Sequence, residues 1–268
     1  MKIFLDSADA EEISQAYTWG VVDGVTTNPT LMKQALEKKK SNTDLEIYLR
    51  TILKTAKGTP VSIEVTETEA EKIIEEGRKF YKMFNHTAKN VCIKIPVNTA
   101  MDEHGKQFEG LKAVKELSRQ KIPVNCTLVF TPEQALLAAK AGAKYISPFA
   151  GRIDDHIRDQ NKMKYGKGDY FPQSGLESAE IKDDNGIASG IDLVRQCVEI
   201  LKIHKLNSEI ISASMRNPRQ VREAALAGAH IATVPFSVLK DMVKHHKTFE
   251  GMKKFSEDTV PEYKKLIK

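Results

Sequence analysis

Polar residues stand at the ends of a series of short, β-branched segments along the chain. In chain order these residues are Asp6, Asn28, Glu64, Lys94, Thr127, Ser147 and Ser214. If the segments are strands of one closed parallel sheet, the carboxyl ends of the strands lie on the same side and these side chains face one pocket. Two carboxylates and a lysine in one pocket provide groups for proton transfer and for nucleophilic attack.

Lys94 is the residue that most needs an explanation, because it lies inside the apolar segment Val-Cys-Ile-Lys-Ile-Pro. Burial removes water from the ammonium form of a lysine and so favours the neutral amine. A neutral amine can condense with a carbonyl substrate to form a Schiff base. The alternative is structural, a buried salt bridge between Lys94 and Asp6 or Glu64. The residues alone leave both interpretations open.

The segments that carry these residues alternate with amphipathic stretches of helical spacing. The expected strands cover residues 3–5, 24–27, 61–65, 91–95, 124–129, 144–147, 209–213 and 230–234. Most of them are apolar on both faces, which predicts a parallel sheet covered by helices. Eight such units in 268 residues predict an α/β fold, a (β/α)8 or TIM barrel. A doubly wound open sheet is the alternative, but neither GxGxxG nor GxxxxGK[ST] occurs in the sequence.

Two stretches depart from this alternation. The long insertion after the sixth strand, residues 148–187, exceeds an ordinary connection. We expect a short helix near 154–165 in it, and interpret the rest as a surface excursion or as a lid. The tail, 248–268, is expected to add a helical extension to a single barrel domain spanning 1–268. Its apolar residues are expected to pack on the barrel or on a neighbouring subunit, and they are Phe249, Met252, Phe255, Val260, Tyr263 and Ile267.

Composition narrows the class of protein. Hydrophobic residues make up 41% of the chain, but no run of about 18 apolar residues predicts a membrane span. The N-terminal residues lack the apolar region of a secretory signal. The cysteines, Cys92, Cys126 and Cys197, fit neither a disulfide framework nor a metal site, which favours the cytoplasm. The net charge of +5 is spread along the chain and forms no basic patch of the kind that binds nucleic acid.

Six blocks of sequence resemble, in order, the motifs of the short transaldolase and fructose-6-phosphate aldolase family. They are residues 2–8, 23–31, 92–97, 125–130, 147–155 and 213–218. The resemblance spans nearly the whole chain. It implies a class I, Schiff-base barrel enzyme that needs no metal and no cofactor, acts on sugar phosphates and assembles as a homo-oligomeric ring, often a decamer.

The resemblance also implies a role for each site residue. Lys94 would form the Schiff base with a ketose phosphate, and Asp6 would be the general base and acid of carbon–carbon cleavage. Glu64 and Thr127 would hold the water that is exchanged when the imine forms and is hydrolysed. The implied substrate-binding residues are Asn28 and Ser147 at the dihydroxyacetone hydroxyls, Arg152, Ser214 and Arg216 at the phosphate, and Thr26 and Phe149 elsewhere in the pocket.

Two residues separate the activities found in this family. As the resemblance implies, a glutamate at position 64 accompanies transaldolases, whereas the aldolase branch tends to carry glutamine there and tyrosine at position 149. Glu64 and Phe149 therefore favour a transaldolase of the pentose phosphate pathway, which transfers dihydroxyacetone from sedoheptulose 7-phosphate or fructose 6-phosphate to an aldose phosphate. The alternatives are a fructose-6-phosphate aldolase that releases free dihydroxyacetone, and an inactive barrel that only binds sugar phosphates.

The chain departs from the family pattern in length and at two apolar positions. It is longer than the short members, with the excess in Leu36–Pro60, Asp102–Lys106 and Arg158–Ala188. Ala150 and Met215 stand where valine and phenylalanine are expected. Because the last of these segments follows Arg152, the resemblance does not define the geometry around the phosphate or the choice of acceptor.

Overall fold

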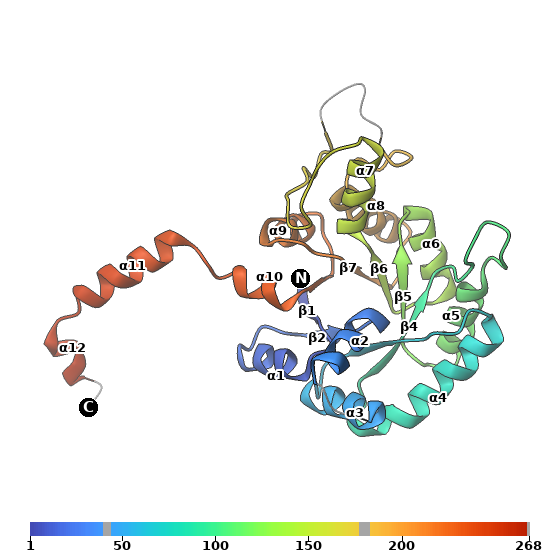
Figure 1. The fold of residues 1–268 in the computed structure, drawn as a ribbon, viewed down its shortest axis with the longest axis horizontal. Coiled ribbons are helices and arrows are strands. Elements are labelled where there is room, and N and C mark those ends of the chain that lie inside the picture. Colours follow the sequence, from blue (N-terminus) through green and yellow to red (C-terminus); the bar gives the residue numbers. More distant parts are fainter. Residues whose placement is uncertain (40–43, 177–182, 267–268) are drawn as a thin grey trace.

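The computed structural model describes residues 1–39, 44–176 and 183–266. Its strands form a closed barrel in which each strand is parallel to both neighbours, in chain order around the ring (Figure 1). They are β1 (Lys2–Asp6), β2 (Gly24–Thr26), β3 (Val61–Glu64), β4 (Val91–Pro96), β5 (Val124–Val129), β6 (Tyr145–Pro148), β7 (Glu209–Ser212) and β8 (Ile231–Val234). The predicted TIM barrel is confirmed, and each expected strand is present with its ends shifted by a residue at most.

Helices follow the strands, and all but the last two, α11 and α12, surround the barrel (Figure 1). They are α1 (Ala10–Thr18), α2 (Pro29–Lys38), α3 (Leu45–Thr55), α4 (Ala70–Ala88), α5 (Glu109–Arg119), α6 (Pro132–Ala141), α7 (Ala150–Gln160), α8 (Gly190–Ile203), α9 (Pro218–Leu226), α10 (Phe236–Asp241), α11 (His246–Glu257) and α12 (Pro261–Lys265). None of these helices is long and apolar enough to cross a membrane.

The barrel closes between β1 and β8, where Phe4 is in register with Thr233, while on its other side Phe4 is in register with Gly24 of β2. A Cβ at Gly24 would lie 2.6 Å from the Phe4 ring, so a larger residue there would require the ring to move. The strands are buried on both faces, as their apolar sequences predict. The closed ring fixes where the carboxyl end of each strand points, and the predicted site residues lie at those ends.

The insertion after β6 differs from the prediction in its helix. The helix expected near 154–165 is α7, which begins at Ala150 and ends at Gln160. It begins directly after the strand, and it ends where Lys162 adopts a left-handed backbone with φ of 54°. The later part of the insertion, 161–176, runs back over α7 and α9. Residues 177–182, which belong to the same predicted surface excursion or lid, lie outside the described part of the chain.

The C-terminal extension forms two helices, α11 and α12, which project away from the barrel (Figure 1). The extension begins at His246, two residues before the predicted boundary. The expectation that it packs on its own barrel is wrong for α11, in which no residue is buried. The short exposed stretch 242–245 after α10 leads the chain outward, so the apolar face of α11 has no surface of the same barrel to cover. Ile267, one of the predicted apolar residues, lies outside the described residues.

Candidate active site

A cavity of about 400 Å³ lies at the carboxyl ends of the strands. Nine of the predicted site residues line it, namely Asp6, Thr26, Asn28, Lys94, Ser147, Phe149, Arg152, Ser214 and Arg216. Each lies in the last part of a strand or shortly after one, so the closed barrel brings them together from distant parts of the sequence. Glu64 and Thr127 do not line the cavity, although both lie on strands beside β4, which carries Lys94.

Lys94 lies inside the barrel with only 4% of its surface exposed. Its Nζ is 3.0 Å from Oε2 of Glu64 and donates a hydrogen bond of 3.0 Å to the carbonyl oxygen of Thr27. The ion pair follows from the register of β3 and β4, which places Glu64 beside Lys94. The structure thus contains the predicted salt bridge, and the same lysine also borders the cavity, so the two sequence-based interpretations are compatible. A carboxylate at this distance can accept the proton that the ammonium group must lose before it attacks a carbonyl.

Asp6 is the second carboxylate of the site. Its Oδ1 accepts a hydrogen bond of 2.8 Å from the hydroxyl of Thr26, which itself lies 2.5 Å from the hydroxyl of Thr233. Burial raises the pKa of the Asp6 carboxyl above its usual value, against the opposing influence of the Lys94 charge and the Thr26 hydrogen bond. A carboxyl group with a raised pKa exchanges protons more readily near neutral pH than an ordinary aspartate does.

Thr233 is a cavity residue that the sequence analysis missed. The eighth strand seemed to lack a polar end, because Val234 is its last residue and Thr233 precedes it. The signal that could have identified Thr233 was its hydroxyl group within an otherwise apolar strand.

A buried chain of hydrogen bonds crosses the barrel beside Lys94. The Ser147 hydroxyl donates to Oδ1 of Asn125 at 2.7 Å, and Nδ2 of Asn125 donates to the Ser62 hydroxyl at 3.1 Å. Asn125 is in register with Lys94 on the adjacent strand. The sequence analysis singled out Ser147 but missed Asn125 and Ser62, although polar side chains inside buried strands signal such pairing. These hydrogen bonds fix the Ser147 side chain at the cavity wall.

Thr127 lies in an irregular part of β5. The register with β6 shifts between Cys126 and Val129, and Leu128 has a positive φ of 53°, which is uncommon for a leucine. The Thr127 hydroxyl is buried and has no hydrogen-bond partner among the described residues. Buried hydroxyls are normally paired, so this one retains the capacity to form a hydrogen bond.

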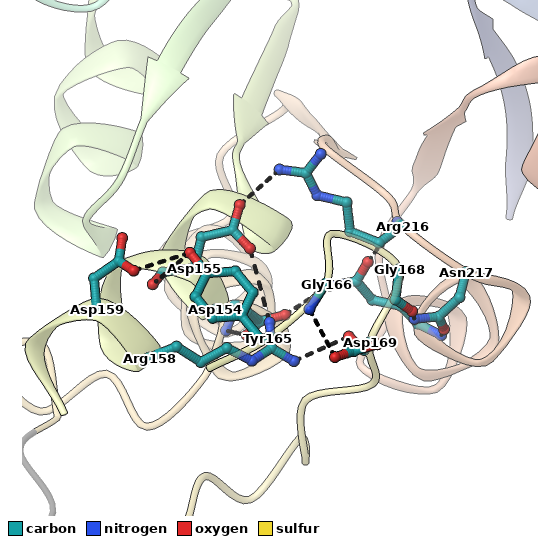
Figure 2. A network of polar contacts seen from close by, with 12 residues as sticks. Asp154, Asp155, Arg158, Asp159, Tyr165, Gly166, Gly168, Asp169, Arg216 and Asn217 are labelled. Atoms are coloured by element: carbon teal, nitrogen blue, oxygen red, sulfur yellow. Dashed lines mark hydrogen bonds and ion pairs between the residues drawn. The ribbon is translucent and has the colours of Figure 1, made fainter. Parts of the chain in front are cut away.

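Cationic side chains gather at one side of the cavity. Arg152 extends from the first turn of α7 and its guanidinium lies 5.1 Å from the centre of the Phe149 ring. Arg216 donates through Nη2 to Oδ2 of Asp155 at 2.8 Å (Figure 2). Nε of Arg216 is buried and has no partner within the described residues. Ser214 completes the group with a left-handed backbone at φ of 63°. Guanidinium donors with free positions suit an oxyanion such as a phosphate.

The backbone next to these cations is held by Asp154. This buried carboxylate accepts hydrogen bonds of 2.7 Å from the backbone N–H of Gly190 and from Nε2 of Gln220. Oε1 of Gln220 in turn accepts from the backbone N–H of Arg216. Burial raises the pKa of Asp154 to about 7. Asp154 and Asp155 therefore position Arg216, one through its backbone and the other through its side chain.

Asn28 caps a helix in addition to lining the cavity. It is the N-cap of α2, where its Oδ1 accepts from the backbone N–H of Leu31 at 2.9 Å. Its Nδ2 group is the part left to contact a substrate.

Among the described residues, no group of three or more histidine, cysteine, aspartate or glutamate side chains could hold a metal ion.

The fold and the cavity together define an α/β-barrel enzyme with a lysine–carboxylate pair, a separate carboxylate and a cationic end. This arrangement is suited to an anionic carbonyl substrate that a lysine binds covalently. The chain belongs to the transaldolase/fructose-6-phosphate aldolase family, whose model matches residues 3–267. The resemblance noted in the sequence is confirmed.

Curated relatives match the chain over nearly its whole length. A probable transaldolase of Thermoplasma acidophilum is 42% identical over 258 residues, covering 96% of this chain and 95% of the relative. Probable transaldolases of Clostridium perfringens and Thermus thermophilus are each 41% identical, covering 96% of this chain and 97% of the relative. Family and relatives together support transaldolase activity.

Proposed function

We propose that the protein is a transaldolase that transfers a dihydroxyacetone unit from a ketose phosphate to an aldose phosphate through a Schiff base on Lys94. The observation that carries this proposal is the position of Lys94, which is buried, paired with Glu64 and exposed only toward the cavity that Asp6 also lines. Fructose 6-phosphate and sedoheptulose 7-phosphate, of the pentose phosphate pathway, are the proposed donors.

Schiff-base formation uses the Lys94–Glu64 pair. Glu64 takes a proton from the ammonium group, and the free amine attacks the ketone carbon of the donor. The carbinolamine then loses its hydroxyl as water when a proton returns to that oxygen. Thr127 supports this step, since its unpaired buried hydroxyl can hold the departing water beside the imine. The reverse sequence hydrolyses the imine.

Cleavage of the carbon–carbon bond requires a base at the donor hydroxyl next to that bond. Asp6 accepts this proton, the bond electrons move into the protonated imine, and an aldose phosphate leaves. The acceptor aldehyde then adds to the same carbon, and Asp6 returns the proton to its oxygen. Two carboxylates of the same site can perform separate proton transfers when they contact different groups, and here Glu64 pairs with Lys94 whereas Asp6 accepts a hydrogen bond from Thr26.

Substrate binding is shared between the two ends of the cavity. Asn28 and Ser147 face the dihydroxyacetone hydroxyls, with Thr26 and Phe149 completing the wall. Arg152, Ser214 and Arg216 bind the phosphate, and their place together at one side of the cavity supports this assignment.

Borohydride trapping tests the proposal directly. Fructose 6-phosphate and borohydride should add a stable dihydroxyacetone-derived mass to the wild-type protein, detected by intact mass spectrometry and mapped to Lys94. Lys94→Met should lose the adduct, whereas the surface control Lys140→Met should keep it. A wild-type protein that is never labelled, or a Lys94→Met protein that is labelled equally, would contradict the proposal.

Fructose-6-phosphate aldolase is the alternative activity within the same family, and Glu64 and Phe149 favour transfer over it. Transfer from fructose 6-phosphate to erythrose 4-phosphate should be much faster than release of free dihydroxyacetone, measured in paired assays on one preparation. Equal rates would favour the aldolase. Labelling at Lys94 with neither reaction detectable would leave an inactive sugar-phosphate binder.

We further propose a cytoplasmic protein built of one barrel domain over 1–268 and assembled as a homo-oligomeric ring, with a decamer as the size that the family resemblance implies. The buried, unpaired state of Cys92, Cys126 and Cys197 is compatible with a reducing compartment. The exposed apolar residues of α11 and α12 support contact with a second copy of the chain.

A further inference from the structure

The long insertion contributes a side chain of its own to the cationic end of the cavity. Lys167, which no family motif in the sequence includes, lines the cavity together with Arg152 and Arg216. It belongs to the segment between α7 and α8 that makes this chain longer than the short members of the family. The following contacts show how the backbone that carries Lys167 is held.

Lys167 sits in a tight turn over residues 166–169. The backbone N–H of Asp169 donates to the Gly166 carbonyl at 3.0 Å, and the backbone N–H of Gly166 donates to Oδ2 of Asp169 at 2.8 Å. Nδ2 of Asn217, the residue after Arg216, donates to the Gly168 carbonyl at 3.2 Å. The turn is therefore tied to the segment that carries the phosphate-binding arginine (Figure 2).

A buried arginine anchors the same turn from the side of α7. Nη2 of Arg158 donates to the Asp169 carbonyl at 2.9 Å (Figure 2). Its guanidinium lies 4.9 Å from the centre of the Tyr165 ring and 5.0 Å from that of Phe171. Phe171 itself is buried in the core. Because the backbone around Lys167 is already ordered, only its side chain must be immobilised when a ligand binds.

Charges at this end of the cavity do not balance without a ligand. Asp155 is 2.8 Å from Arg216 and offsets its charge. Arg152 and Lys167 form no ion pair with any carboxylate of the described residues. Two positive charges thus remain, which matches a phosphate monoester that carries nearly two negative charges at neutral pH. Arg152 alone would neutralise only about half of the negative charge of such a dianion.

We propose that Lys167 is a further phosphate-binding residue, and that the insertion thereby increases selectivity for phosphorylated over non-phosphorylated acceptors. This inference rests on the proposed function, because it assigns a new residue to the phosphate end of the same site. Lys167 is distant in sequence from the family's phosphate-binding motifs and acts on substrate affinity, not on the Schiff-base chemistry.

The test compares two acceptors that differ only in the phosphate, D-glyceraldehyde 3-phosphate and D-glyceraldehyde, with sedoheptulose 7-phosphate as the donor, saturating for each variant. Lys167→Gln should raise the KM for glyceraldehyde 3-phosphate about tenfold and leave its kcat within about twofold, because a charged hydrogen bond to phosphate is lost. The kcat/KM for glyceraldehyde should not change. The inhibition constant of inorganic phosphate against fructose 6-phosphate should rise by a similar factor.

Lys164→Gln is the matched control, since Lys164 is an exposed lysine of the same insertion that does not line the cavity. It should leave every constant unchanged, and Lys167→Arg should restore most of the affinity. Equal constants for Lys167→Gln and wild type, or an equal loss with both acceptors, would overturn the inference. Borohydride labelling of Lys94 in wild type separates this outcome from failure of the proposed function, which would abolish labelling and transfer in every variant.

Discussion

Asp6 shows how a single side chain is adjusted by its neighbours. Burial favours its protonated form, whereas the Lys94 charge and the Thr26 hydroxyl favour the carboxylate. In the proposed mechanism Asp6 accepts a proton during cleavage, so it must be ionised in the free enzyme. Activity should therefore be lost as the pH falls through the raised pKa of Asp6, at a higher pH than for an ordinary aspartate.

Thr26→Val tests this relation. Removing the hydroxyl takes away a hydrogen bond that lowers the pKa of Asp6, so the pKa rises further and the acid limb of kcat/KM should move to higher pH. The measurement is the pH profile of transfer from fructose 6-phosphate. Thr18→Val, whose hydroxyl bonds only within α1, should leave the profile in place. A Thr26→Val profile that coincides with wild type, or that moves to lower pH, would show that another group sets the acid limb.

The sequence identified most of the cavity residues because they stand at strand ends and within recognisable motifs. It missed Asn125, Ser62 and Thr233, which lie inside strands and matter through their partners on other strands. It also left open whether Asp6 or Glu64 pairs with Lys94. Each of these contacts depends on the register between neighbouring strands. The sequence of residue types along the chain does not specify that register.

At the scale of elements, the approach of α7 to the segment after β7 defines the cationic end of the cavity, where we propose that the phosphate binds. Gly151, in the first turn of α7, permits this approach: a Cβ there would lie 2.1 Å from the Ser214 carbonyl oxygen and 2.7 Å from Nε of Arg216. Phe149 and Ala213 form a parallel bridge that extends the pairing of β6 and β7 to the same point. Two connecting segments thus meet with no space for a side chain between them.

Gly151→Ala should displace Ser214 and Arg216 together. We expect the KM for fructose 6-phosphate to rise at least several-fold, and the free energy of unfolding to fall by about 1–3 kcal/mol, as when a packed interior is overfilled. Steady-state kinetics and urea denaturation measure the two effects. Gly251→Ala is the control, because a Cβ at that glycine meets no atom within 4 Å. Unchanged kinetics in Gly151→Ala would mean that Ser214 and Arg216 do not bind the phosphate in the positions described.

Elements differ in how well the sequence predicts them. The strands are unbroken apolar segments bounded by turns, so their limits were clear within a residue. The helix in the insertion was placed too late, because it begins directly after β6 and ends before Lys162, whose backbone is left-handed. Within it, Arg158 looks like a solvent-exposed helical residue, whereas it is buried between Tyr165 and Phe171. Contacts of this kind appear only when the chain has folded back on itself.

For the whole molecule, the C-terminal extension is the feature that the barrel itself does not explain. Phe249, Met252 and Phe255 are each more than half exposed on α11, which leaves a contiguous apolar face in water. Removing residues 246–268 should reduce the mass of the assembly measured by light scattering, while far-ultraviolet circular dichroism and borohydride labelling remain as in wild type.

Removing only residues 259–268, which retains α11, should cause a smaller change in mass than removing both helices. If the mass per particle is unchanged without 246–268, the extension does not hold subunits together. If the shortened protein loses its circular dichroism signal, the extension supports the barrel instead.

Closure of the ring by β8 has a consequence for synthesis of the protein. Asp6 is made well before Thr233, whose hydroxyl lies beside that of Thr26, the hydrogen-bond partner of Asp6. A nascent chain on the ribosome therefore carries Lys94 and both carboxylates before their surroundings are complete. If these residues act as proposed, turnover can begin only after the last strand has emerged from the ribosome.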